Sequence, residues 1–188
     1  MSDLASAMPG ADAQGLVTIR EAGLVGMVTF RGDLSAAATK KAVKSATGCD
    51  MPERRGVVTA GDNGVAWMSP DELLVICPHD LAERVAADLS EAMGEAHNLA
   101  LNVSDVRAVF EVTGPAWRDV LAKVTPADLS RDVFGPGEMR RTRMAQVAAA
   151  VWMTGDDTVR VICFRSVARY MFDLLALSAQ EGGAVGYH

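Results

Sequence analysis

Apolar residues recur with two different periods in the first half of the chain, and the changes of period predict its elements. Residues 24–31 are rich in Val, Met and Phe and predict a strand. Asp33 then caps a predicted helix that Gly48 ends, with an apolar face formed by Leu34, Ala38, Ala42 and Ala46. Three short strands follow, at residues 57–60, 65–69 and 73–77. Asp80 and Glu83 resemble a capping box and begin a second helix, which carries Leu81, Val85 and Leu89.

The second half of the chain repeats this order of elements. Residues 108–113 predict a strand, and Gly114-Pro115 leads into a helix whose apolar stripe consists of Trp117, Val120, Leu121 and Val124. Further strands are predicted at residues 139–144, 146–153 and 158–164. Ser166 is expected to cap the last helix, whose apolar face carries Val167, Tyr170, Met171, Leu174 and Leu175.

Two matching stretches indicate that the halves arose by duplication. The sequence VAWMS at residues 65–69 matches AVWMT at residues 150–154, an offset of 85 (152 − 67). The triplet Val-Ile-Cys at residues 75–77 recurs at residues 161–163, an offset of 86 (163 − 77). Chance similarity of short apolar strands is the alternative, but the shared order of elements favours duplication. We therefore predict that the halves superpose, with Trp67 on Trp152 and Cys77 on Cys163.

A strand, a helix, further strands and a helix, present twice, define the expected fold class. It is α+β, with antiparallel sheets covered by helices, because each unit must bury the apolar face of its sheet under another layer. Residues 16–97 form the first predicted repeat and residues 98–188 the second, fused as one compact domain. Residues 1–15 are small, Ala- and Gly-rich and polar, and they predict a flexible N-terminal arm.

Charge and composition argue against several classes of partner. The formal net charge of the 188 residues is −6 and aromatic residues make up 5%. Neither nucleic acid nor an anionic membrane is therefore an expected partner, since both require a basic face. No apolar run approaches the length of a membrane span, and residues 1–15 lack the features of a signal peptide. The three widely spaced cysteines fit a reducing compartment, so a cytoplasmic location is expected.

The sequence shows no recognisable set of catalytic, cofactor-binding or metal-binding residues. Neither of the common Gly-rich phosphate-binding patterns occurs. His79, His97 and His188 have no His or Cys partner at metal-ligand spacing. Cys77 and Cys163 end apolar runs and are interpreted as small buried hydrophobic residues. We therefore expect no catalytic residue, cofactor or metal in this chain.

Arginines crowd one predicted strand of this acidic chain. Arg140, Arg141 and Arg143 lie between Met139 and Met144, and strand alternation places Arg141 and Arg143 on one face. One interpretation is an edge strand whose charges block unwanted pairing. The other is a contact with a partner or an anion through bidentate hydrogen bonds, since Arg and Met are both enriched in interface cores. The sequence leaves both open, and these five residues form the predicted partner interface.

An ordered set of segments resembles the gamma subunit family of heterotetrameric sarcosine oxidase. The segments are RGDL at residues 31–34, AVKSATG at 42–48, AWMSPDELLV at 66–75, NVSDVRAVF at 102–110 and FRSVARYMFD at 164–173. The resemblance implies a non-catalytic subunit that supports assembly with alpha, beta and delta subunits, chiefly with the folate-binding domain of alpha. It implies that FAD, FMN, NAD and tetrahydrofolate bind to those partners. It further implies a complex that oxidatively demethylates sarcosine to glycine and transfers the one-carbon unit to tetrahydrofolate.

The second half also resembles, more remotely, the folate-binding domain of the glycine-cleavage aminomethyltransferase. NVSD at residues 102–105, followed by FEVTGP at 110–115, is similar to that family's Asp-Val-Ser-His segment and the strand after it. That family places a Gly-Gly and Asp-Asp segment, with a carboxylate for folate chemistry, where this chain has QVAAA at residues 146–150. The resemblance thus implies an inherited fold and a lost site. Two alternatives stay open, an autonomous folate-dependent one-carbon transferase and a free-standing folate-binding or small-ligand-binding module.

Overall fold

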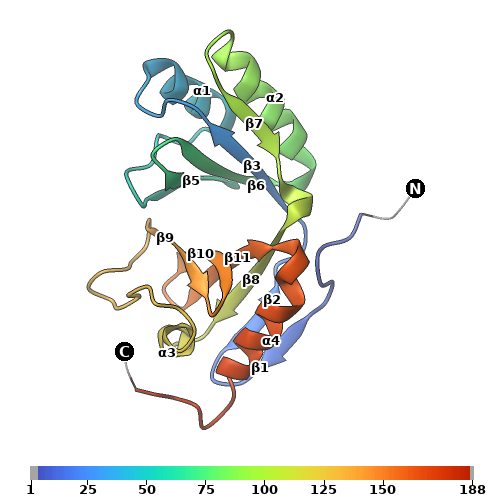
Figure 1. Cartoon of the computed structure of the whole chain (residues 1–188), viewed down its shortest axis with the longest axis vertical. Helices are drawn as coiled ribbons and strands as arrows, with labels where there is room; N and C mark the ends of the chain where they lie inside the picture. Colours follow the sequence, from blue (N-terminus) through green and yellow to red (C-terminus); the bar gives the residue numbers. More distant parts are fainter. Residues whose placement is uncertain (1–3, 187–188) are drawn as a thin grey trace. The chain divides into compact units, whose positions relative to one another are not determined.

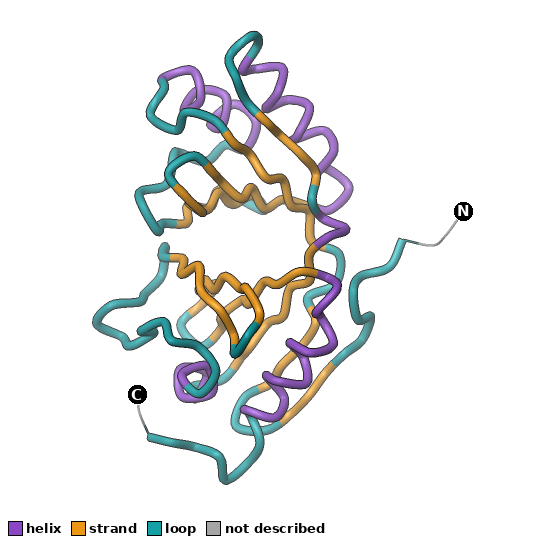
Figure 2. The backbone as a smooth tube through the Cα atoms, in the orientation of Figure 1, coloured by secondary structure: helices purple, strands orange, loops and turns teal. Residues whose placement is uncertain are grey.

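A computed structural model describes residues 4–186, which fold into two units (Figure 1). The first unit is Leu24–Asp105, and the second unit combines Met1–Gly23 with Val106–His188. Each unit contains one antiparallel sheet and two α-helices. Figure 2 distinguishes the helices, strands and loops by colour. The predicted α+β class is confirmed.

The sheet of the first unit has five strands in the order β4-β5-β6-β3-β7. They are β3 (Val25–Arg31), β4 (Val57–Ala60), β5 (Asn63–Ser69), β6 (Glu72–Pro78) and β7 (Leu99–Asn102). Helices α1 (Ala37–Thr47) and α2 (Ala82–Met93) cover one face, and the 3₁₀ turn η1 (His79–Leu81) leads into α2. Alternation along the strands directs every second side chain into the helix-covered core, including Val28, Phe30, Val75 and Cys77.

The sheet of the second unit has six strands in the order β1-β2-β8-β11-β10-β9. They are β1 (Asp12–Gln14), β2 (Thr18–Glu21), β8 (Arg107–Thr113), β9 (Met139–Met144), β10 (Val147–Gly155) and β11 (Thr158–Phe164). Helices α3 (Trp117–Ala122) and α4 (Ala168–Ser178) cover one face, with the 3₁₀ turns η2 (Ser104–Val106) before β8 and η3 (Arg165–Val167) before α4. The core on this face includes Phe110, Trp117, Val151, Val161 and Met171.

Five strands of one sheet correspond one to one with five strands of the other. The order β4-β5-β6-β3-β7 matches β9-β10-β11-β8-β2. The hairpins share a bulge, which falls between Trp67 and Ser69 in β5 and between Met153 and Gly155 in β10, 86 residues later (153 − 67). The central strands β3 and β8 also have the same pattern of buried and exposed residues. The predicted duplication is therefore confirmed.

The register corrects one of the predicted matches. Trp67 corresponds to Met153 and not to Trp152, because the shared bulge fixes the offset at 86. Met153 lies in the helix-covered core, whereas Trp152, the preceding residue in the strand, points to the opposite face. The two Trp-Met pairs are therefore one residue out of step. Cys77 and Cys163 do correspond, and both lie in the cores.

Each sequence repeat begins with a strand that pairs with a strand of the other repeat. β2 precedes β3 in the chain but pairs with β8, and β7 precedes β8 but pairs with β3. Thr18–Glu21 keeps against β8 the same register that Leu99–Asn102 keeps against β3. The sequence repeats expected at residues 16–97 and 98–188 thus differ from the two units, because each unit takes one strand, β2 or β7, from the other repeat.

Most of the expected N-terminal arm is held against the second unit. Arg165 donates hydrogen bonds from Nη2 to the carbonyl oxygens of Ala5 and Ser6, both at 3.0 Å. The hydroxyl of Ser6 donates to a carboxylate oxygen of Glu21 at 2.9 Å, and Asp12–Gln14 pairs with β2. The prediction of a flexible arm is corrected for residues 4–15, because backbone pairing and these side chains fix them. Residues 1–3 lie outside the described part.

Candidate functional site

The predicted interface residues lie on β9, at the edge of the six-stranded sheet. Arg140 and Thr142 lie opposite Val151 and Ala149, two residues of the helix-covered core. Arg141 and Arg143 therefore point to the other face of the sheet, as strand alternation predicts. Within residues 4–186, β9 pairs with β10 alone.

Met139 and Met144 are interior residues. Met139 is 1% exposed and lies opposite Trp152, and Met144 is 0% exposed and belongs to the helix-covered core. The structure therefore places both methionines at packing positions. The apolar ends of β9 anchor the strand, and its arginines lie between them.

Arg140 is committed to neighbouring groups of its own chain. Its guanidinium donates to the carbonyl oxygens of Val133 and Met139 and forms an ion pair with Glu138 at 3.0 Å. It also lies 5.1 Å from the centre of the Phe134 ring. Burial disfavours the charged form of Glu138, but hydrogen bonds from Gly135 N–H and from Arg140 outweigh it and lower the pKa of the carboxyl. Arg140 thus secures the loop before β9.

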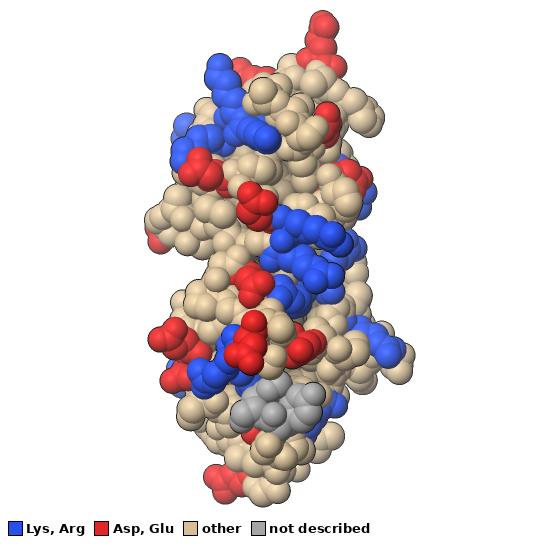
Figure 3. Space-filling view, turned by 90° about the vertical axis from the view of Figure 1, so that its left-hand side faces the viewer, with Lys and Arg blue, Asp and Glu red and all other residues tan. Residues whose placement is uncertain are grey.

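Arg141 and Arg143 are exposed and lie opposite Ala150 and Ala148 of β10. These small side chains leave room for both guanidinium groups on the same face. On the molecular face drawn in Figure 3, basic side chains gather in several places with acidic side chains beside them. The structure therefore brings together two of the five predicted residues as an exposed basic pair.

The sequence analysis missed a buried arginine in the second unit. Arg118 is 5% exposed, and its guanidinium donates to the carbonyl oxygens of Leu129 and Phe134, the latter at 3.1 Å. It also lies 4.2 Å from the centre of the Trp117 ring. Burial, with a smaller contribution from the charge of Arg131, lowers the pKa of Arg118. Its position in α3, one residue after a core tryptophan, was the available sequence signal.

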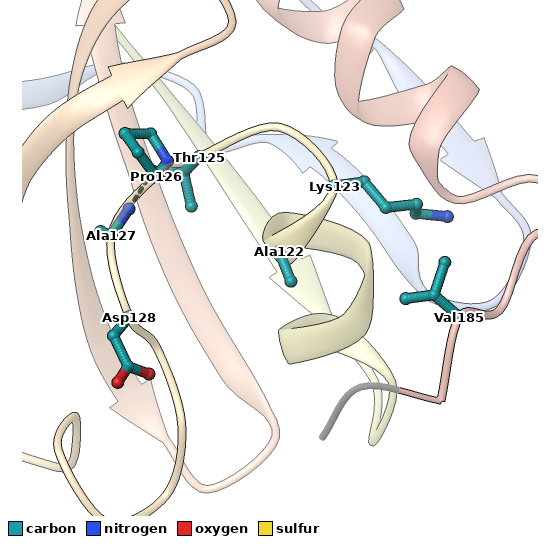
Figure 4. A pocket seen from close by; sticks show the side chains of 7 residues that line it. All are labelled: Ala122, Lys123, Thr125, Pro126, Ala127, Asp128 and Val185. Carbon is teal, nitrogen blue, oxygen red and sulfur yellow. Dashed lines mark hydrogen bonds between the residues drawn. The ribbon is translucent and has the colours of Figure 1, made fainter.

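A pocket of about 450 Å³ lies between the segment after α3 and the C-terminal segment (Figure 4). Its lining consists of Ala122, Lys123, Thr125, Pro126, Ala127, Asp128 and Val185. The amine of Lys123 donates to the carbonyl oxygens of Ser178 and Gly183, and Thr125 accepts a hydrogen bond from the Ala127 N–H at 3.3 Å. Because these polar groups are engaged within the chain, they do not converge on a ligand.

The cysteines do not provide reactive or metal-binding groups. Cys49, Cys77 and Cys163 are buried free thiols, which confirms the interpretation of Cys77 and Cys163 as small core residues. Burial raises the pKa of Cys163 to about 12, against a smaller opposing effect of Arg107, and burial together with Asp80 raises the pKa of Cys77. Residues 4–186 contain no group of three or more His, Cys, Asp or Glu placed to hold a metal ion.

Two solved structures, an aminomethyltransferase and a sarcosine oxidase chain, share the fold of this chain. It matches the aminomethyltransferase T of the glycine cleavage system from Bartonella henselae with a TM-score of 0.62 and 10% identity, over 87% of this chain and 46% of that chain. It matches a chain of heterotetrameric sarcosine oxidase from Corynebacterium sp. U-96 with a TM-score of 0.81 and 26% identity, over 89% of this chain and 87% of that chain. The predicted aminomethyltransferase-like fold is confirmed.

Sequence comparison identifies the family. The model of the sarcosine oxidase, gamma subunit family matches residues 31–181. Sarcosine oxidase subunit gamma from Corynebacterium sp. (strain P-1) is 34% identical over 157 residues, which span 82% of this chain and 76% of the relative. The subunit gamma from an Arthrobacter species is 32% identical over 161 residues, spanning 85% and 78%. The chain belongs to the sarcosine oxidase gamma subunit family. Within residues 4–186, no helix is long and apolar enough to cross a membrane.

Proposed function

We propose that this chain is a non-catalytic subunit that supports assembly of a heterotetrameric sarcosine oxidase with alpha, beta and delta subunits. The single observation that carries the proposal is the match over nearly the whole chain to a component of a heterotetrameric sarcosine oxidase. Membership of the gamma subunit family supports it. The complex oxidatively demethylates sarcosine to glycine and passes the one-carbon unit to tetrahydrofolate, in the cytoplasm.

The cofactors FAD, FMN, NAD and tetrahydrofolate bind to the partner subunits in this proposal. The alanine run of β10 supports this, because Ala148, Ala149 and Ala150 have no side-chain group that holds a pterin or moves a proton. Ala149 and Ala150 are also buried. The same observation argues against an autonomous folate-dependent transferase. It favours a duplicated fold that presents surfaces to partners.

The exposed pair Arg141 and Arg143 is one such surface, and the folate-binding domain of alpha is the proposed partner there. A planar guanidinium binds a carboxylate through two parallel hydrogen bonds, so two of them on one strand suit an acidic patch. Met139 and Met144 contribute by fixing β9 from within, and Arg140 by fixing the preceding loop.

Co-expression tests the proposal. An affinity-tagged copy of this chain is expressed with the alpha, beta and delta chains of the same organism, and the purified material is analysed by size-exclusion chromatography with mass spectrometry. The expected result is one species that contains four different chains and flavin. Recovery of the tagged chain alone, while the other three form an active complex without it, contradicts the proposal.

A further inference from the structure

Helix α4 presents an apolar stripe to solvent. Tyr170 is 46% exposed and Leu177 is 63% exposed, and Leu174 between them is half-buried. The spacing i, i+4, i+7 places the three side chains along one side of the helix. Met171 and Leu175, on the adjacent side, pack into the core of the second unit, and Leu174 packs against the same core. The apolar surface of this helix therefore extends beyond its buried side to the exposed Tyr170 and Leu177.

The duplicated fold contains its own comparison for this stripe. Helix α2 occupies the same place in the first unit, 86 residues earlier (168 − 82), after the equivalent strand and 3₁₀ turn. The positions equivalent to Tyr170, Leu174 and Leu177 are Arg84, Asp88 and Glu91, and all three are exposed. Arg84 and Asp88 form an ion pair at 3.7 Å on the surface of α2.

The buried faces of the two helices agree, so the difference is confined to the outer side. Val85 and Leu89 of α2 correspond to Met171 and Leu175 of α4, and all four are buried. The fold thus requires an apolar inner face at both places, and it accepts a charged outer face in α2. Leu174 also packs against the core of the second unit, but Tyr170 and Leu177 leave apolar surface exposed where α2 has charged residues, which indicates a contact with something outside the chain.

The charges beside the stripe cancel each other. Arg169 donates from Nε to both carboxylate oxygens of Asp173, at 3.0 and 2.8 Å, within one helical turn. No net charge therefore borders the stripe on that side, and charge complementarity favours an uncharged, apolar partner surface. Three side chains on one helix cover far less than the roughly 800 Å² per partner of a stable stand-alone interface. This argues against a dimer of this chain through α4 and for one seam of a larger interface.

We propose that the outer side of α4, formed by Tyr170, Leu174 and Leu177, docks against an apolar face of another subunit of the heterotetramer. This inference rests on the proposed function, because that assembly supplies the partner. Tyr170 is the anchor, since aromatic side chains give large contact areas at low entropic cost and are enriched at interface centres. Leu174 and Leu177 extend the seam along the helix.

Transplanting the residues of α2 onto α4 tests the docking surface. The variant Tyr170→Arg with Leu177→Glu installs the residues that α2 carries at the equivalent exposed positions, so folding is expected to persist. It is co-expressed with the three partner chains, and the partners retained on the tagged chain are quantified. We expect retention to fall at least about tenfold, the loss typical of truncating a central anchor. The matched control, Arg84→Ala with Glu91→Ala on α2, is expected to retain the partners as the wild type does.

The outcomes separate the two proposals. If the wild-type chain assembles and the α4 variant assembles equally well, the docking surface is overturned while the proposed function stands. If the wild-type chain itself recruits no partner, the proposed function fails. Thermal unfolding of the isolated variant, within a few degrees of wild type, supports a loss of docking, and an unfolded variant overturns the claim that the stripe is dispensable for folding. If light scattering shows that the isolated wild-type chain is a dimer and that the α4 variant is a monomer, the stripe binds a second copy of this chain, and the proposed docking against another subunit is overturned.

Discussion

Replacement of Arg118 by methionine should destabilise the second unit by about 3 kcal/mol. Methionine keeps most of the aliphatic volume against Trp117, so the change removes the guanidinium and little packing. The carbonyl oxygens of Leu129 and Phe134 then lose their donor in a buried place. An unsatisfied buried polar group costs about 1–3 kcal/mol, and two such groups at about 1.5 kcal/mol each give the expected total.

The same reasoning predicts where the damage appears. Arg118 joins α3 to the long segment that precedes β9, because Leu129 and Phe134 both belong to that segment. Loss of the guanidinium should therefore increase amide hydrogen exchange at residues 128–138 more than in the first unit. Arg118→Lys keeps a charge but not the planar fork, so its loss of stability should be intermediate.

Urea unfolding followed by tryptophan fluorescence measures the free energy of unfolding of each variant. Arg131→Met is the control, since Arg131 is exposed and surface changes usually alter stability by less than about 0.5 kcal/mol. Equal stability of Arg118→Met and wild type, with unchanged exchange at residues 128–138, would refute the anchoring role of the buried guanidinium.

Three further predictions follow from individual contacts. The raised pKa of Cys163, about 12, means that the folded state holds the thiol proton more tightly than the unfolded state, whose pKa is about 8.5. This contribution to the free energy of unfolding is fully present below about pH 8.5 and is lost as the pH rises toward 12. Between these values the free energy of unfolding of the wild type should fall by up to about 1.4 kcal/mol per pH unit more than that of Cys163→Ala. Urea unfolding that gives the same pH dependence for both proteins would contradict this. Ser104→Ala should lower the free energy of unfolding by about 1–3 kcal/mol, because the Ser104 hydroxyl accepts a hydrogen bond from the buried Met27 N–H at 2.9 Å. An unchanged thermal unfolding temperature would show that this bond is dispensable. Arg141→Glu with Arg143→Glu should leave the isolated chain folded but weaken capture of the alpha subunit, since like charges facing an acidic partner can cost several kcal/mol; wild-type capture would identify β9 as an edge protected against pairing and nothing more.

Hydrophobic period was sufficient to predict the central strands and helices. Strand 24–31 and the helix after residue 81 were predictable because their apolar residues alternate or recur over several turns. The short strands β1, β2 and β7 escaped prediction, since three or four residues such as Thr18–Glu21 are too few to show a period. Their pairing depends on partners far away in the sequence.

Local polar signals located some helix boundaries imprecisely. Asp33 has the sequence of an N-cap, yet helix α1 begins at Ala37, and the carboxylate of Asp33 accepts a hydrogen bond from the Ser35 N–H at 2.9 Å. Asp residues stabilise such turns as readily as helix starts. In the same way, Asp80 and Ser166 lie in 3₁₀ turns that precede their helices.

Strand alternation predicted that Arg141 and Arg143 share a face, but it could not predict the burial of Met139 and Met144. Alternation alone places Arg141 and Arg143 together, but it does not say which face of an edge strand is buried. Met139 is buried although it shares their face, because it lies opposite Trp152. The stripe on α4 was hidden for another reason. The sequence shows Tyr170 and Leu174 as parts of one apolar face, and only comparison with α2 shows that the fold accepts charged residues at the outer positions.

The most direct test of the central claim compares the isolated chain with the assembled complex in a single assay. Sarcosine-dependent formation of hydrogen peroxide is measured for the purified chain, for the alpha, beta and delta subunits without it, and for all four together, with visible absorbance recorded for each. The account predicts a colourless and inactive isolated chain that joins a flavin-containing, active complex. Bound flavin or peroxide formation in the isolated chain, or its failure to enter the active complex, would contradict the account.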